Sequence, residues 1–216
     1  MSIASNLKNI QSQIPNHVTL VAVSKTKPVT DLMEAYVAGQ RIFGENKIQE
    51  MVDKYQQMPK DIQWHMIGHV QSNKVKYMAP FVSLIHGVDS FSLLKEINKQ
   101  ALKHNRVIDC LLQVHIAQEE TKFGLNEAEL QELLGSEDFK ALKNIQIKGL
   151  MGMATFTNDE AQVKKEFEYL KSLFDQFTIH HPPFTILSMG MSGDYKLAID
   201  AGSTMIRVGS SIFGSR

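Results

Sequence analysis

The stretch VTLVAVS, residues 18–24, decides the fold class, because apolar side chains occupy its odd and its even positions alike. A strand with this pattern is buried on both faces, which is typical of parallel sheets covered by helices. Pro28 follows shortly after it, and proline is favoured at the first position of a helix. The segment therefore predicts a strand followed by a helix, with Lys25 at the carboxyl end of the strand.

The same succession of a short apolar run and an amphipathic stretch recurs along the chain, with no linker-like segment between the repeats. Eight such units favour a closed (β/α)8 barrel, the TIM-barrel fold of the α/β class, and an open α/β sheet is the alternative. An additional helix is expected over residues 2–13, and residues 1–216 are expected to form one domain. The predicted strands cover residues 18–24, 41–43, 63–67, 81–85, 108–116, 145–150, 184–187 and 205–208.

Charge and composition narrow the range of partners. Basic and acidic residues number 23 each, so neither nucleic acid nor an anionic membrane is expected as a partner. Cys110 is the only cysteine, which excludes an intrachain disulfide. The amino terminus does not resemble a signal peptide and no apolar run reaches membrane-spanning length, so a cytoplasmic location is expected.

Polar residues gather where the predicted strands end, which is where barrels of this kind carry their active sites. Lys25 ends the first strand, Asn46 follows the second and His65 lies in the third. An amine that is partly desolvated at the end of an apolar strand can attack an aldehyde. The residues alone leave a second interpretation equally open, in which Lys25 only leads the chain out of the barrel into solvent.

Two segments near the carboxyl end fit the loops that bind phosphate in such barrels, after the seventh and eighth strands. SMGMSG, residues 188–193, contains Ser192 and two glycines, and RVGSS, residues 207–211, contains Gly209 and Ser210. Backbone N–H groups in such turns and at helix starts bind anions. Ordinary turn chemistry explains either segment by itself. The two together, in the expected loops, predict a phosphate site.

The histidines do not predict a metal site. His65 and His69 are four residues apart, as in a helical zinc motif. That motif has glutamate directly after the first histidine, where this chain has Met66, and Gly68 interrupts a helix between the two.

Several longer segments resemble the pyridoxal phosphate homeostasis proteins, which are single-domain relatives of the alanine racemase barrel. The resemblance runs from about Val18 to Gly214, and its motifs are long enough to be specific when taken together. The segments are AVSKTKP (22–28), FGENKIQE (43–50), WHMIGHVQSNK (64–74), GLMGMAT (149–155), LSMGMSGDY (187–195) and GSTMIRVGSSIFG (202–214).

The resemblance implies a role for each matching residue. Lys25 matches the lysine that holds pyridoxal phosphate as a Schiff base, and Arg207 matches the arginine that faces the pyridine nitrogen of the cofactor. A fixed cation there disfavours a second positive charge on that nitrogen. The other matches are Asn46 and His65 in the lining of the cofactor pocket, and Ser192, Gly209 and Ser210 at the phosphate.

Two positions depart from the family pattern. Lys47 stands where the family often has an aromatic residue, and His115 stands where an asparagine commonly ends the fifth strand. Either difference is expected to alter the rim of the pocket. Neither belongs to the implied Schiff-base or phosphate positions, so cofactor binding is still expected.

The resemblance implies a protein of intracellular pyridoxal phosphate homeostasis, which buffers the cofactor or delivers it to apo-enzymes that depend on it and is not itself an enzyme. A racemase or related enzyme using pyridoxal phosphate is the alternative. Alanine racemases carry a further β-domain, which supplies a second catalytic base to the partner subunit, whereas this chain ends at Arg216, soon after the eighth strand. Racemisation needs an acid/base on each face of the substrate, so a carrier is expected. A monomer is expected because the racemase dimer contacts of the second domain are missing. A Schiff-base aldolase acting on a sugar phosphate is a third, weaker interpretation.

Overall fold

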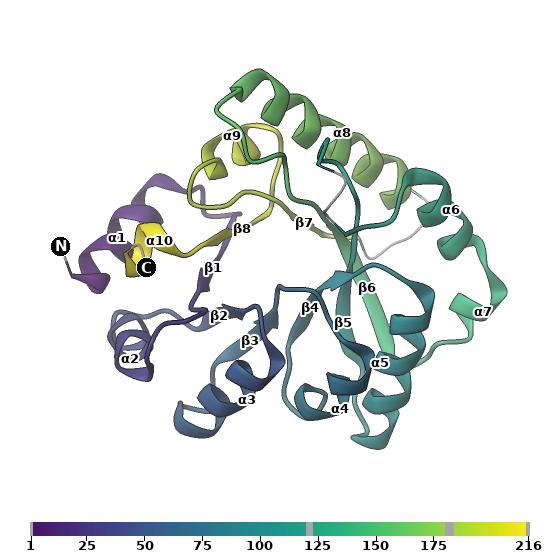
Figure 1. Ribbon diagram of the computed structural model, residues 1–216, viewed down its shortest axis with the longest axis horizontal. Helices are drawn as coiled ribbons and strands as arrows, with labels where there is room; N and C mark the ends of the chain where they lie inside the picture. The colour runs from purple at the N-terminus through teal and green to yellow at the C-terminus, as the bar shows by residue number, and fades with distance from the viewer. Residues whose placement is uncertain (1, 120–122, 180–183, 215–216) are drawn as a thin grey trace.

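The computed structural model describes residues 2–119, 123–179 and 184–214. Eight parallel strands pair in the order of the sequence, and β1 pairs with β8 from Thr19↔Met205 to Ala22↔Val208, which closes the sheet (Figure 1). The predicted (β/α)8 barrel is confirmed, and the open sheet is excluded by this closure. The strands are β1 (Thr19–Val23), β2 (Ile42–Glu45), β3 (Gln63–Met66), β4 (Leu84–Val88), β5 (Ile108–Gln113), β6 (Ile145–Met151), β7 (Ile186–Ser188) and β8 (Met205–Val208).

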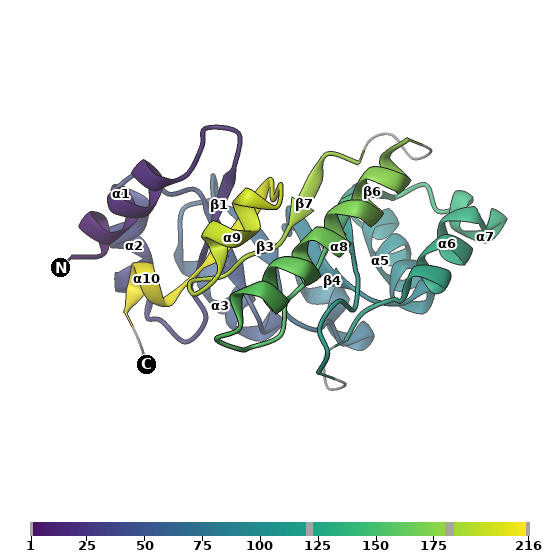
Figure 2. The same cartoon turned by 90° about the horizontal axis from the view of Figure 1, so that it is seen from above.

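Helices surround the barrel and cover the outer faces of its strands (Figure 1). The predicted additional helix is present as α1, which packs against α2 and α10, so that both ends of the described chain lie at one end of the molecule (Figure 2). The helices are α1 (Ile3–Gln13), α2 (Val29–Val37), α3 (Ile48–Gln57), α4 (Val75–Met78) after a 3-10 turn (Ser72–Lys74), α5 (Phe91–Lys103), α6 (Glu127–Gly135), α7 (Glu137–Lys140), α8 (Glu160–Thr178), α9 (Tyr195–Asp200) and α10 (Ser210–Phe213). In the described ranges, none of them has the length and apolar character that a membrane crossing requires.

The expected start of the fourth strand was wrong for a local reason. The strand was predicted over residues 81–85 but begins at Leu84, because the N–H groups of Phe81 and Val82 still donate to Met78 O at the end of α4. Helix α9 begins at Tyr195, because Asp194 accepts a hydrogen bond from Met191 N and holds the preceding residues in a turn.

The barrel interior is layered along its axis. A small apolar cluster fills one level of it, with side chains from β1, β4, β5, β6 and β8. Side chains of a strand alternate between faces, so Arg207, two residues after Met205 of the cluster, and His86, two residues after Leu84, point inward one level nearer the carboxyl ends. The apolar level fills the barrel on the side of the amino ends of the strands. The polar level, nearer the carboxyl ends, forms the floor of the site. The cluster consists of Val21, Leu84, Leu111, Met151 and Met205.

A bulge in β6 depends on Gly149. The pairing with β5 passes from Cys110↔Ile147 to Leu111↔Gly149, so Lys148 is left out of register. Gly149 has φ +150°, a backbone conformation that residues with a Cβ rarely adopt. A Cβ there would also overlap Ile186 O of the neighbouring strand. Only glycine satisfies both the dihedral angle and the close approach of β7.

We expect Gly149→Ala to lower the free energy of unfolding by about 3 kcal/mol or more, because the backbone strain and the clash with β7 add. Gly135→Ala, at the end of α6 where a Cβ meets open space, is the control and should change stability by less than about 1 kcal/mol. Urea denaturation of both variants measures the difference, and equal stabilities would contradict the role assigned to the bulge.

Candidate functional site

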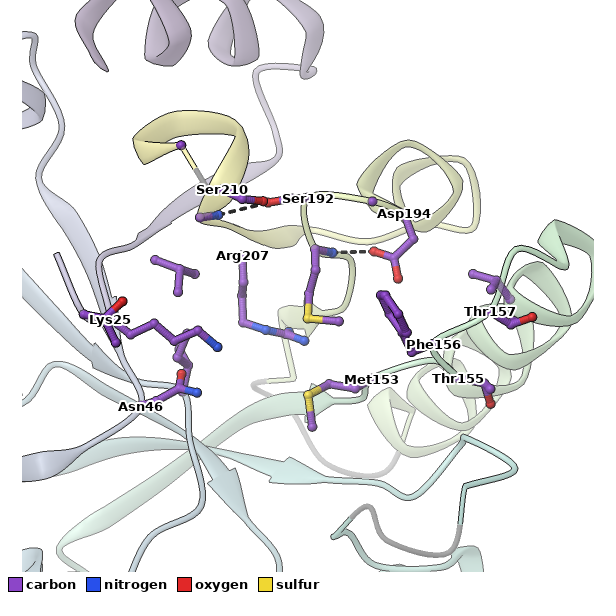
Figure 3. A pocket seen from close by; sticks show the side chains of 18 of the residues that line it. Lys25, Asn46, Met153, Thr155, Phe156, Thr157, Ser192, Asp194, Arg207 and Ser210 are labelled. Atoms are coloured by element: carbon purple, nitrogen blue, oxygen red, sulfur yellow. Dashed lines mark hydrogen bonds between the residues drawn. The ribbon is translucent and has the colours of Figure 1, made fainter. Parts of the chain in front are cut away.

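A pocket of about 600 Å³ opens at the carboxyl ends of the barrel strands. Its volume lies within the ordinary range for sites of small molecules and cofactors. Figure 3 shows Lys25 and Asn46 on one side of it, the loops with Ser192 and Ser210 on another, and Arg207 between them. Six of the seven predicted site residues line this pocket: Lys25, Asn46, Ser192, Arg207, Gly209 and Ser210.

Lys25 is half-buried and follows β1 directly. Its side chain lines the pocket (Figure 3). Lys27 also lines the pocket, and its Nζ donates to Phe213 O at 3.0 Å. The two lysines are therefore held differently, and Lys27 joins the β1 end to α10.

The two phosphate-type loops are joined to each other. Gly209 N donates to Ser192 Oγ at 3.2 Å (Figure 3), and a Cβ on Gly209 would lie only 3.1 Å from Val23 O. Within the described part of the chain, the N–H groups of Ser210 and Ser211 at the start of α10 have no acceptor, as is usual in the first turn of a helix. The loops thus present backbone donors and hydroxyls to one end of the pocket.

Arg207 is a fixed cation at the floor of the pocket. It is only 4% exposed, and its NH1 and NH2 groups donate to Ser188 Oγ at 2.6 Å and to Gly152 O at 3.1 Å. Burial lowers the pKa of Arg207 to about 10, and Asp194 opposes that change. The guanidinium therefore remains charged at neutral pH and is held by two neighbouring strand ends, β6 and β7.

His65, the seventh predicted residue, does not line the pocket. It lies one level deeper than Ile67, which does, and hydrogen bonds through Nδ1 to His86 Nε2 at 3.0 Å. The reason is the alternation of side chains along the strand, which places residue 67 rather than residue 65 at the height of the pocket. The structure therefore places His65 outside the pocket lining, in a series of hydrogen bonds behind Arg207.

One arrangement of hydrogens satisfies every group in this series of hydrogen bonds. Arg207 can only donate, so Ser188 Oγ accepts from it, and the hydroxyl hydrogen of Ser188 has His86 Nδ1, 3.1 Å away, as its acceptor. His86 then carries its proton on Nε2 and donates to His65 Nδ1. Burial lowers the pKa of His65 to about 3 and that of His86 well below its usual value, the latter helped by His65 and Arg207. Both imidazoles are neutral at physiological pH.

The wall of the pocket opposite Lys25 was not predicted from the sequence. Residues 155–158, in the loop after β6, line it together with Met153, and Phe156 is 94% exposed at its edge. Glu166 of α8 holds this segment, accepting from both Thr155 N and Thr155 Oγ1. A polar TFTN run after a strand was the available signal, but ordinary loops share that composition.

Metal ligation finds no support in the described residues, because no three histidine, cysteine, aspartate or glutamate side chains among them cluster suitably. His65 bonds to His86, whereas His69 is largely exposed and pairs with Asp89 at 3.3 Å. The two histidines thus take part in different contacts.

A closed (β/α)8 barrel with a lysine after its first strand and anion-type loops after its last two strands belongs to the class of barrel proteins whose ligand site lies at the carboxyl ends of the strands. Comparison with known families agrees with this class. The chain belongs to the family described as alanine racemase, N-terminal domain, which matches residues 1–216. Among curated relatives, the pyridoxal phosphate homeostasis protein of Vibrio alginolyticus is 40% identical, covering 100% of this chain and 98% of its own length. That of Escherichia coli K12 is 36% identical over 99% of this chain and 97% of its own.

Solved structures support the same grouping. PipY of Synechococcus elongatus PCC7942, solved without PLP, has a TM-score of 0.93 and 37% identity, covering 99% of this chain and all of its own. The form of PipY with PLP bound has a TM-score of 0.90 and 36% identity over the same shares. An alanine racemase from Bartonella henselae shares the fold, with a TM-score of 0.76 and 19% identity over 99% of this chain and 58% of its own.

Acidification from pH 7 to pH 5.5 should destabilise the fold. In the unfolded chain both imidazoles titrate near 6.5, whereas the folded-state pKa values of His65 and His86 lie far lower. The unfolded state therefore binds more protons in this window, so the free energy of unfolding falls as pH falls through 6.5, by about 1 kcal/mol for each histidine. Urea denaturation at the two pH values measures it.

His86→Gln removes one of the two titrating groups and should roughly halve the loss. His104→Gln replaces an exposed histidine and serves as the control, in which the full loss remains. An unchanged loss in His86→Gln would contradict the neutral state assigned to the buried pair.

Proposed function

We propose that this protein binds pyridoxal phosphate in the pocket at the barrel mouth and takes part in cofactor homeostasis, by buffering pyridoxal phosphate or delivering it. One observation carries the proposal: an amine, Lys25, and two anion-type loops face the same pocket, with the cation of Arg207 between them. The relatives named for pyridoxal phosphate homeostasis and the PLP-bound form of PipY support it.

The residues present fit the phosphate end of this cofactor. Ser192, Gly209 and Ser210 line one end of the pocket, and the N–H groups at the start of α10 are available as donors. A Cβ on Gly209 would make a tight contact with Val23 O, and the glycine brings the backbone itself to the pocket wall. Such an arrangement suits an anion, whose charge is met by backbone dipoles and hydroxyl groups.

At the other end, Lys25 is the proposed attachment point. Pyridoxal phosphate supplies an aldehyde, which condenses with a primary amine to a Schiff base and releases one water molecule. Lys25 Nζ provides that amine, and Asn46 lies beside it in the lining of the pocket. The remaining proposed role belongs to Arg207, whose fixed charge disfavours protonation of a ring nitrogen placed near it.

We propose binding without appreciable turnover. Racemisation would need a second acid/base facing Lys25 across the substrate. Lys27 and Asp194 are the other lining residues with lysine or carboxylate side chains in the described pocket, and both are engaged with the backbone, Lys27 with Phe213 O and Asp194 with Met191 N. The exposed edge at Phe156 suits release of a cofactor rather than its enclosure.

Three further expectations belong to the proposal: a single domain that acts as a monomer, a cytoplasmic location, and transfer of the cofactor to apo-enzymes that depend on pyridoxal phosphate. The exposed edge of the pocket supports transfer, because a recipient can approach it without prior opening of the barrel.

Lys25→Ala should abolish the visible absorption band that forms when pyridoxal phosphate is added to the protein, because the covalent bond cannot form without the amine. Borohydride reduction followed by mass spectrometry should place the cofactor on Lys25 in the unsubstituted protein. Lys47→Ala, an exposed lysine outside the pocket lining, is the control and should keep the band.

Absence of the band in the unsubstituted protein, or its survival in Lys25→Ala, would overturn the assignment of Lys25. The loaded protein should also be incubated with D- and L-amino acids. Turnover above roughly 1 s⁻¹, an ordinary enzyme rate, would overturn the carrier function in favour of a racemase.

Ser192→Ala should weaken binding of pyridoxal phosphate about fivefold to tenfold, because it removes a pocket hydroxyl and the hydrogen bond that joins the two loops, worth about 1 kcal/mol. Asn158→Ala alters the opposite wall of the pocket and should change the affinity less than twofold. Fluorescence titration measures both. A larger effect at Asn158 than at Ser192 would contradict the proposal that the phosphate binds at the end of the pocket lined by Ser192.

A further inference from the structure

A buried cluster of charge lies behind the end of β1, outside the pocket. Lys54 of α3 is the cation, and its side chain is only 6% exposed. Its Nζ donates to three oxygens, each 2.7 Å away: Ser24 O, Glu45 Oε1 and Glu50 Oε1. The ammonium thus has all three of its hydrogens engaged. None of these charged side chains lines the pocket.

The cluster contacts the chain on both sides of Lys25. On the amino-terminal side, Lys54 holds Ser24 O, and Ser24 Oγ donates to Glu45 Oε1 at 2.6 Å. On the carboxyl-terminal side, Thr26 N donates to Glu50 Oε1 at 2.6 Å. The backbone groups on both sides of Lys25, Ser24 O and Thr26 N, are therefore held by one set of side chains from β2 and α3.

The backbone at Thr26 needs such support. Thr26 has φ +64°, in the left-handed region that a β-branched residue rarely enters. A residue in this conformation costs on the order of 1 kcal/mol and persists where the surroundings hold it, often at functional sites. The hydrogen bond that Thr26 N donates to the Glu50 carboxylate holds this turn, which directly follows Lys25.

Stability alone does not account for the cluster. Glu45 is fully buried, burial raises its pKa while Lys54 opposes the rise, and its Oε2 has no hydrogen-bond partner among the described residues. Buried ion pairs of this kind contribute little stability compared with apolar residues of similar volume, since desolvation offsets the attraction. Their directional hydrogen bonds, however, define geometry more narrowly than apolar contacts do.

We propose that Lys54, together with Glu45 and Glu50, positions Lys25 for covalent capture of the aldehyde by fixing the backbone of Ser24 and Thr26. The proposal rests on the function proposed above. These three side chains are positioning residues, which act through the backbone and touch no ligand themselves.

A matched pair of substitutions at Glu50 tests the proposal. Glu50 is partly exposed, so its replacement leaves the contacts of Lys54 to Glu45 and Ser24 in place. Glu50→Ala removes the acceptor of Thr26 N, whereas Glu50→Gln keeps an amide oxygen there and removes only the charge. Asp53→Ala, an exposed acidic residue on the same helix, controls for changes in α3. Lys54→Met combined with Glu45→Gln tests the Ser24 side without leaving an unpaired buried charge.

Two ligands separate positioning from binding. Stopped-flow absorbance measures the rate of covalent capture of pyridoxal phosphate, and fluorescence titration measures the affinity for pyridoxine phosphate, which has an alcohol in place of the aldehyde. We expect Glu50→Ala and the double variant to capture pyridoxal phosphate about tenfold to a hundredfold more slowly, because small displacements of a reacting group have effects of that size. Affinity for pyridoxine phosphate should stay within about twofold, because the phosphate loops are untouched. Glu50→Gln should recover most of the rate, and Asp53→Ala should retain it.

The outcomes distinguish the two proposals. Capture at the unsubstituted rate in both Glu50→Ala and the double variant would overturn the positioning proposal and leave the proposed function standing. Glu50→Gln as slow as Glu50→Ala would overturn it as well, because charge and not the hydrogen bond would then be responsible. A parallel loss of affinity for pyridoxine phosphate would overturn it in favour of a general structural role. No covalent capture by the unsubstituted protein would overturn the proposed function, and the positioning proposal with it.

Discussion

Closure of the barrel between β1 and β8 is the constraint on which the site depends. The register Val21↔Arg207 brings the first strand beside the last, although about 190 residues separate them in the chain. Lys25 leaves the barrel next to the loop that contains Gly209 and Ser210, and both face one pocket. In an open sheet with the same strand order these two strands would lie at opposite edges, and the amine and the anion-type loops would not share a site.

The layering of the barrel interior determines the electrostatics of the floor of the pocket. Below Arg207 lies the apolar level with Met205, and beside it runs the chain through Ser188, His86 and His65. A buried guanidinium is costly unless its donors are satisfied, and Ser188 Oγ supplies one of the acceptors that Arg207 needs. Burial keeps the histidines neutral, whereas Arg207 stays charged. Among the described residues, Arg207 is therefore the single fixed cation of that level.

Hydrogen bonds outside the barrel hold the other side of the pocket. Lys54, Glu45 and Glu50 lie outside the barrel and hold the residues that flank Lys25. The hydrogen-bonded series of Ser188, His86 and His65 lies inside the barrel and holds Arg207. Each pocket residue that is proposed to act on the ring or the aldehyde is thus placed by buried polar groups that do not reach the pocket. The wall around Phe156 is held by the buried carboxylate of Glu166, but Phe156 itself is 94% exposed, which fits an edge through which a ligand passes.

Three features could be predicted from the sequence alone, because strand periodicity and turn chemistry are local properties. They are the eight repeating units, the position of Lys25 after the first strand, and the two loops with Ser192, Gly209 and Ser210. Only the tertiary structure decided which side chains meet. His65 went below the pocket rather than into its lining, because the depth of a residue depends on where strand and pocket level intersect. Lys54 looked like any charged residue of an amphipathic helix, and its burial follows from the packing of α3 against the ends of β1 and β2, which no local pattern encodes.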